Sequence, residues 1–177
     1  RPQTRNAMTM AMVRELRKAL NDAQTGGVRV IVLRGEGGHF CSGADLNDIT
    51  AARNRAAQPD DRERQAIPAP DPMAEVNAHF GELCVAFAGT GIATVSVVEG
   101  TVMGGGFGLA CVPDVTLAAD TAIFRLPETS LGVVPAQIAP FLVERLGYAE
   151  AKRLAVTGGQ VDARQALAIR LVHEVHE

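Results

Sequence analysis

The sequence predicts an α/β fold with sheets buried beneath helices, and three observations support this class. Short apolar runs rich in β-branched residues, such as residues 28–33 and 92–98, alternate with segments whose apolar residues recur at helical spacing. Small-residue turns, above all the three consecutive glycines at positions 104–106, separate the two kinds of segment. The 177 residues, 47% of them hydrophobic and 21% charged, suit one globular domain with a sizeable core and argue against disorder.

Each element is assigned from its local pattern. Helices are expected where apolar residues recur every three or four positions, as Met12, Leu16 and Leu20 do, and strands where β-branched residues cluster. In chain order we expect a helix over 6–24, a strand over 28–33 buried on both faces, a helix from 46 to about 55, a helix over 75–88, a strand over 92–98, a pair of strands over 115–119 and 122–126, helices over 136–146 and 149–156, a last helix opening at 162–165, and a closing strand over 171–175.

Capping and breaking residues set the expected ends of the helices. Thr9 or Asn6 can cap the first helix, because their side-chain oxygens accept from the first backbone N–H groups. Asp162 and Gln165 have the spacing of a capping box. Pro140 lies inside the segment 136–146, so we expect a kink or a break there.

The composition changes between residues 51 and 72, where charged residues are followed by several prolines. We expect a mobile surface segment that could serve as a lid over a site. A loop without function is the preferred alternative.

Charge and cysteine usage restrict the class of protein. A net charge of −3 offers no general nucleic-acid footprint, and no apolar run reaches the roughly 18–20 residues of a membrane span. Cys41, Cys84 and Cys111 form no CxxC pair, so we expect reduced, buried cysteines and a cytoplasmic protein. His173 and His176 do not form an H-E-x-x-H motif, and we predict no metal site.

Two small-residue turns can supply hydrogen-bond donors to a ligand. Residues 104–106 follow a strand and open a helix, whose first N–H groups have no partner within the helix and favour negative charge. Gly43 and Ala44 repeat this arrangement before the helix that starts at 46. If the two turns face each other, the N–H groups of Ala44 and Gly105 can bind one oxygen as an oxyanion hole. Ordinary strand-to-helix turns are the alternative.

Glu128 supplies one carboxylate at the end of an apolar strand. The neighbouring Phe124, Leu126 and Leu131 favour a raised pKa for this carboxyl by desolvation, which suits an acid or base. The glycine turn does not fit the dinucleotide motif G-x-G-x-x-G, since no glycine stands at its last position.

A set of motifs in this order resembles the enoyl-CoA hydratase/isomerase family, also called the crotonase family. The motifs lie at 6–8, 40–46, 104–106, 126–128, 131–132, 135 and 157–158. The resemblance implies a spiral of repeated ββα units and an acyl-CoA thioester as the substrate, without a separate cofactor. It also implies a homotrimer or a dimer of trimers. Residues 1–177 would be the core domain, because the family has a strand before this region and a helical region after it.

The family's functional positions map onto residues of this chain. The resemblance places the oxyanion donors on Ala44 and Gly105 and the catalytic carboxylate on Glu128. The positions that it implies for substrate or CoA binding are Arg5, Ala7, Ser42, Gly43, Ala44, Asp45, Leu46, Gly104, Gly105 and Pro127.

One departure leaves the reaction open. Two-glutamate hydratases of the family have a second glutamate where this chain has Gly108. A single Glu128 is enough to isomerise an enoyl thioester, and a non-catalytic acyl-CoA-binding protein is a further alternative. Residues 104–110 and 127–141 are similar to hydratases of branched glutaconyl-CoA esters, so hydration of a 2-enoyl-CoA is slightly favoured.

Overall fold

The computed structural model describes residues 1–56 and 72–177. Its helices are α1 (Met10–Thr25), α2 (Leu46–Ala56), α3 (Pro72–Ala88), α4 (Gly105–Cys111), α5 (Ala139–Leu146), α6 (Tyr148–Thr157) and α7 (Ala163–Ala168), with the 3₁₀ turns η1 (Pro2–Thr4) and η3 (Glu128–Leu131). Its strands are β1 (Val30–Arg34), β2 (Ala93–Val98), β3 (Thr101–Met103), β4 (Val115–Ala119), β5 (Ile123–Arg125), β6 (Gln160–Asp162) and β7 (Glu174–His176).

The strands form two sheets, and between β2 and β5 the chain alternates from one sheet to the other. The four-stranded sheet has the order β1-β2-β4-β7 and is parallel throughout. In the three-stranded sheet, of order β3-β5-β6, β3 and β5 are parallel and β6 is antiparallel. Each of the units β2-β3-α4 and β4-β5-η3 therefore gives one strand to each sheet. This repeat is the expected spiral of ββα units.

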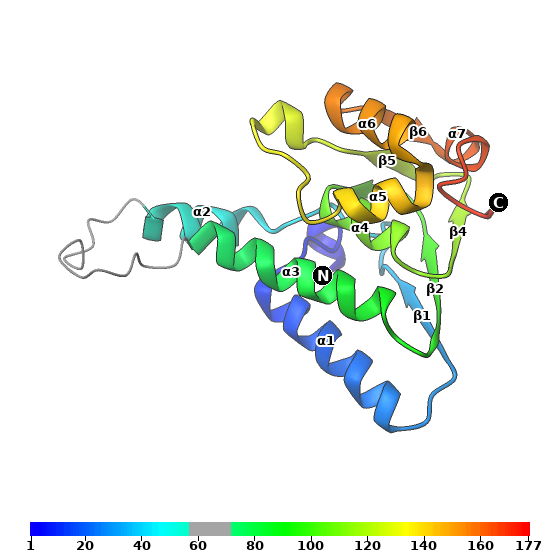
Figure 1. Ribbon diagram of the computed structural model, residues 1–177, viewed down its shortest axis with the longest axis horizontal. Coiled ribbons are helices and arrows are strands. Elements are labelled where there is room, and N and C mark those ends of the chain that lie inside the picture. The colour runs from blue at the N-terminus through cyan, green and yellow to red at the C-terminus, as the bar shows by residue number, and fades with distance from the viewer. Residues whose placement is uncertain (57–71) are drawn as a thin grey trace.

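The helix α4 occupies the centre of the molecule and contacts α3, α5, β2 and β3. From Gly106 to Cys111 every residue of α4 is buried. The ring of Phe107 meets that of Phe124 on β5 edge-to-face, with their centroids 5.7 Å apart. In Figure 1, α1 and α3 lie side by side below α4, and α5, α6 and α7 lie above it.

Two expectations about the strands are wrong. The strand over 28–33 is not buried on both faces, because β1 is an edge strand and Val30 and Val32 are 52% and 61% exposed. The strands expected over 115–119 and 122–126 do not pair with each other, since β4 and β5 belong to different sheets.

The ends of the helices follow the capping residues, with two corrections. The first helix starts at Met10 and not at residue 6, and Thr9 caps it by accepting from the Met12 N–H at 3.2 Å. Asn6 has φ 55° and donates instead to the carbonyl oxygens of residues 36 and 39. The helix expected over 136–146 starts only at Ala139, so Pro140 lies in its first turn, where it removes no helical hydrogen bond.

The other expected ends are close to those observed. The capping box of Asp162 and Gln165 is present at the start of α7. The closing strand is shorter than expected, because Leu171 and Val172 are buried in a turn ahead of β7. Of the segment 51–72, residues 51–56 continue α2, and the rest of the expected lid lies outside the described residues apart from the start of α3.

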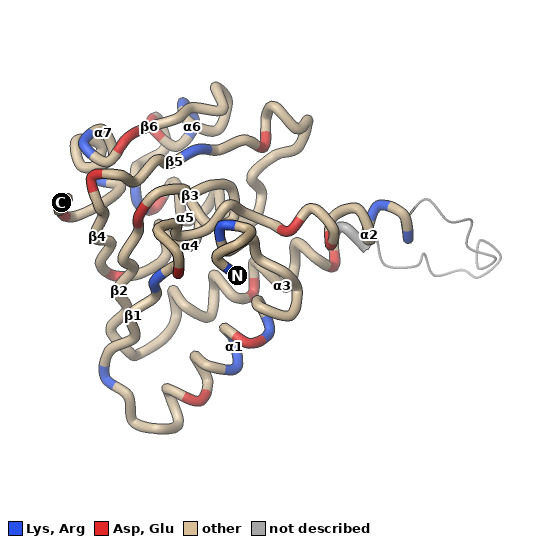
Figure 2. The backbone as a smooth tube through the Cα atoms, turned by 180° about the vertical axis from the view of Figure 1, so that it is seen from behind, with Lys and Arg blue, Asp and Glu red and all other residues tan. Residues whose placement is uncertain are grey.

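The structure also shows where the charged residues of α1 and the three cysteines lie. Figure 2 shows acidic and basic residues interspersed along α1. Cys41, Cys84 and Cys111 are free and buried, as expected. None of the described helices is long and apolar enough to cross a membrane.

Candidate active site

The segment 41–44 lies between the N-terminal segment and β3. On one side Met8 forms a parallel bridge with Ala44, its N–H donating to the Gly43 carbonyl at 2.8 Å. On the other side Cys41 bridges to Val102 of β3. These two bridges hold the turn of Gly43 and Ala44 beside the end of β3, where the second glycine turn begins.

The two turns touch through their backbones. Gly43 has φ 96°, and a Cβ there would lie 3.3 Å from the Met103 carbonyl oxygen. Gly104 has φ 51°, and its Cβ would lie 3.8 Å from the Cα of Gly43. A Cβ on Gly106 would lie only 2.7 Å from the Cys41 carbonyl oxygen. Glycine is needed at these positions because positive φ angles and close backbone approach exclude a side chain.

Two backbone donors remain at this contact. Gly105 is the first residue of α4, where a helix has no internal acceptor for the N–H group. Within residues 1–56 and 72–177, neither the Ala44 N–H nor the Gly105 N–H has a hydrogen-bond acceptor. The Gly104 N–H, in contrast, donates to the Arg125 carbonyl at 3.1 Å. The contact of the two turns therefore has unused donors of the kind that stabilise negative oxygen.

Glu128 lies against the glycine turn. It is the first residue of η3, directly after the buried Leu126 and the half-buried Pro127. Its Oε1 atom lies 3.2 Å from the point where a Cβ on Gly104 would be. Its Oε2 atom is buried and, among the described residues, has no hydrogen-bond partner. Burial raises the pKa of this carboxyl, the direction expected from the sequence. Leu131 adds little to this burial, because it is 62% exposed.

The position of the family's second carboxylate is closed by a neighbouring side chain. A Cβ on Gly108 would lie 2.1 Å from the Cγ2 of Ile138, a residue that is only 2% exposed. Met8 and Phe80 close the far side of the turn, since a Cβ on Gly105 would lie 2.8 Å from Met8 Cε and 3.2 Å from Phe80 Cζ. The sequence holds no local signal that could have found Ile138 or Phe80.

The expected CoA-binding residues divide into two groups. Arg5 and Leu46 are exposed, Leu46 at 75%, and so are open to a ligand. Ser42 is partly occupied, because its hydroxyl donates to the Thr4 carbonyl at 3.0 Å. Asp45 is directed inward, where it forms an ion pair with Arg1 at 2.8 Å.

Asp45 therefore holds the turn in place. The hydrogen bond from Arg1 holds the pKa of the Asp45 carboxyl below its usual value, and the Asn47 N–H donates to the same carboxylate at 2.9 Å. Ala7, also expected near the ligand, is 9% exposed. No group of three or more His, Cys, Asp or Glu side chains that could hold a metal exists in the part of the chain that the structure describes.

Solved structures share this fold. The chain superimposes with a TM-score of 0.89 on an enoyl-CoA hydratase/isomerase from Marinobacter aquaeolei, at 44% identity over 100% of this chain and 64% of that chain. It also matches AtuE from Pseudomonas aeruginosa with a TM-score of 0.89, at 46% identity over 99% of this chain and 64% of that one.

The relatives found by sequence belong to the same family, and some are named hydratases and others isomerases. A probable mitochondrial enoyl-CoA hydratase 2 of Arabidopsis thaliana is 30% identical over 100% of this chain and 56% of its own length. A peroxisomal Δ(3,5)-Δ(2,4)-dienoyl-CoA isomerase of the same plant is 29% identical over 99% of this chain and 62% of its own length. The chain thus spans somewhat more than half the length of these relatives. A family model described as enoyl-CoA hydratase/isomerase matches residues 1–177, and the chain belongs to this family and has the crotonase fold.

Proposed function

We propose that this chain binds the thioester of an enoyl-CoA at the contact of its two turns and hydrates the double bond. One observation carries the proposal: among the described residues, the N–H groups of Ala44 and Gly105 have no acceptor, and the buried Oε2 atom of the nearby Glu128 has no hydrogen-bond partner. The two N–H groups are open to a ligand, because Ala44 is exposed and Gly105 is half-buried. The buried Glu128 Oε2 atom, which has no partner among the described residues, reduces stability, so the three groups together favour a ligand that binds them all.

The two amides would stabilise the charge that develops during the reaction. A thioester carbonyl accepting from Ala44 and Gly105 becomes more negative as the double bond is attacked. The positive end of α4 adds to the effect of the amides. Removing one such donor typically raises the barrier by about 2.7–4 kcal/mol.

Glu128 would move the proton. Its carboxylate takes a proton from water while the water oxygen bonds to C3, and the electrons of the C2–C3 double bond move onto the thioester oxygen. The enolate then collapses, and C2 takes the proton back from the Glu128 carboxyl. Because one carboxylate performs both transfers, hydrogen and hydroxyl should add to the same face.

The finer assignments rest on the family resemblance. We propose a branched glutaconyl-type acyl group as the substrate class, and CoA contacts from Arg5, Ala7, residues 42–46, residues 104–105 and Pro127. A homotrimer or a dimer of trimers and a cytoplasmic location are proposed on the same ground.

Isomerisation of an enoyl-CoA is a second candidate, favoured by the Gly108–Ile138 contact. With Ile138 at 2.1 Å from the missing Cβ, no second carboxylate can enter from position 108 to hold a water. A single carboxylate would then remove a proton from one carbon and return it to another.

The test compares Glu128→Gln with the matched control Glu15→Gln, an exposed carboxylate on α1. Each variant is incubated with a panel of straight, branched and carboxylated enoyl-CoA esters, and the masses of the products are measured by mass spectrometry. Hydration adds the mass of one water, whereas isomerisation leaves the mass unchanged. Glu128→Gln should lower kcat by about 10²–10⁴-fold while acyl-CoA binding persists. Unchanged turnover in Glu128→Gln would remove this residue from the mechanism, and ester binding without any turnover by the unaltered protein would indicate a non-catalytic binder.

A further inference from the structure

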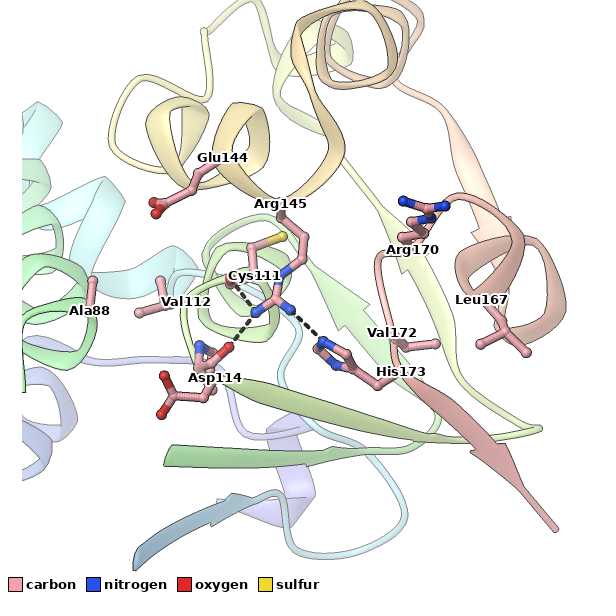
Figure 3. Close-up of a pocket in the computed structure, with 11 residues that line it drawn as sticks. Ala88, Cys111, Val112, Asp114, Glu144, Arg145, Leu167, Arg170, Val172 and His173 are labelled. Atoms are coloured by element: carbon pink, nitrogen blue, oxygen red, sulfur yellow. Dashed lines mark hydrogen bonds between the residues drawn. The ribbon is translucent and has the colours of Figure 1, made fainter. Parts of the chain in front are cut away.

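A cavity lies at the opposite end of α4 from the two turns. Its volume is about 600 Å³, within the range of small-molecule sites. Figure 3 shows its lining, which comes from the last residue of α3, the end of α4 and the turn that follows, α5, α7, and the segment between α7 and β7. Three of the lining side chains, Arg145, Arg170 and His173, are basic.

Arg145 has one nitrogen left for a ligand. Its Nε and Nη2 atoms donate to the Cys111 carbonyl at 3.1 and 2.9 Å, and Nη2 also donates to the Pro113 carbonyl. The guanidinium thus neutralises the negative end of α4. Its Nη1 atom faces the Nε2 atom of His173 at 3.1 Å.

The imidazole of His173 lies between two donors. Its Nδ1 atom accepts from the Thr116 N–H at 2.9 Å, which places the proton of the neutral ring on Nε2. The Nε2–H and the Arg145 Nη1–H then face each other as two donors. In the other tautomer the conflict moves to Thr116. Neither tautomer satisfies both contacts, whereas an acceptor that bridges Nη1 and Nε2 would satisfy the pair. His173 is exposed and Arg145 is half-buried, so the two nitrogens are open to such an acceptor from solution.

Arg170 occupies a position that favours glycine. It follows α7 with φ 62°, a left-handed conformation that strains a residue with a Cβ. It nevertheless places a third basic side chain at this cavity. Backbone strain retained at a cavity is a feature of functional positions.

The acidic side chains of the lining do not supply the acceptor for Arg145 Nη1 and His173 Nε2. Asp114 is already engaged, because its Oδ2 atom accepts from the Thr94 N–H at 2.7 Å and from the Thr94 hydroxyl at 2.8 Å. Figure 3 shows Glu144 directed away from the guanidinium of Arg145.

We propose that this cavity binds a small oxyanion, a phosphate or carboxylate group, between Arg145 Nη1 and His173 Nε2, with Arg170 adding positive charge. The site is separate from the proposed catalytic contact, because the seven residues of α4 lie between them. The bound oxyanion would not be a substrate of the proposed reaction.

The first test follows the isotope-labelled protein by NMR during titration with inorganic phosphate or with acetate, at constant ionic strength held with sodium chloride. Phosphate should shift the Thr116 amide and the His173 ring saturably, at millimolar concentration. The matched variant is His173→Asn, whose side-chain oxygen can still accept from Thr116 but which has no donor at the Nε2 position. Its affinity should fall about tenfold. The acetate arm shows whether a carboxylate binds as well as a phosphate does.

The second test uses Arg170→Gly, which removes the strain together with the charge. We expect Tm to rise by about 2–4 °C while phosphate affinity falls about two- to fivefold. A merely structural Arg170 would leave affinity unchanged. The proposal is overturned if chloride alone reproduces the shifts, or if His173→Asn and Arg170→Gly bind phosphate as the unaltered protein does.

Discussion

The two ends of α4 differ in what happens to the backbone polar groups that have no partner within the helix. At the N-terminal end, glycines allow backbone to touch backbone, and the N–H groups of Ala44 and Gly105 keep no acceptor within the described chain. At the C-terminal end, the carbonyl oxygens of Cys111 and Pro113 accept from one long side chain, that of Arg145. One end is rigid and leaves its polar groups open, whereas the other is closed by a flexible cap.

The N-terminal end is suited to stabilising charge in a reaction, whereas the C-terminal end is suited to stabilising the fold. Donors that do not reorganise during a reaction are the most effective at stabilising charge, and closely packed backbone cannot move. A side-chain cap can adapt, so its loss should be partly recoverable by a shorter cation. Substitutions at the two ends should therefore differ in size and in how far they can be rescued.

The largest expected loss of stability is at the N-terminal end, in Gly106→Ala. The new Cβ would lie 2.7 Å from both the Cβ and the carbonyl oxygen of Cys41, and the backbone oxygen cannot move without shifting the turn. We expect the free energy of unfolding in urea to fall by about 3 kcal/mol. The control is Gly91→Ala, where a Cβ meets nothing within 4 Å. A stabilised Gly106→Ala, the usual result of this exchange in a helix, would show that the packing is looser than described.

A smaller loss is expected at the C-terminal end, in Arg145→Met. It keeps much of the packing but leaves the carbonyl oxygens of Cys111 and Pro113 without this donor, which should lower the free energy of unfolding by about 2 kcal/mol. Arg145→Lys should recover part of the loss. The comparison variant is Arg164→Met, at an exposed position of α7. If lysine gives no recovery, the end is as rigid as the other, and the contrast between the two ends is lost.

Local patterns predicted the parts of the fold that depend on local chemistry. The helix expected from 46 to about 55 and the one over 149–156 lie within two residues of α2 and α6. Glycine turns can be recognised in a sequence because only glycine tolerates their backbone angles and contacts. That is why the turns at Gly43 and Gly104 could be recognised from sequence. Glu128 was named from its place at the end of an apolar strand and from the family resemblance, and its catalytic role stays a prediction.

Long-range contacts were not predictable from the same patterns. The burial of β1 depends on its place at the edge of the sheet, which its β-branched composition does not encode. The chain crosses between sheets within the short turn from β4 to β5, so two adjacent apolar runs resembled a pair. Ile138 opposite Gly108 and Arg1 opposite Asp45 join residues far apart in the sequence.

The smallest effect should be a gain in stability, in Glu128→Gln. Burial raises the pKa of Glu128 in the folded protein above its usual value near 4.5, so ionised Glu128 destabilises the fold at neutral pH. Glutamine carries no charge, so it should raise the free energy of unfolding by about 1 kcal/mol or less at neutral pH, after allowance for partial exposure. The gain should fade as pH drops through the raised pKa and should be absent near the usual value.

Thermal or urea unfolding of Glu128→Gln and of Glu15→Gln across this pH range tests the sign. A gain confined to the first variant and to the higher pH would show that the N-terminal end of α4 holds a charge against stability, as a preorganised site must. A loss of stability at neutral pH would mean instead that the Glu128 carboxylate has partners that hold it in place. The open end of α4 would then be as satisfied as the capped one.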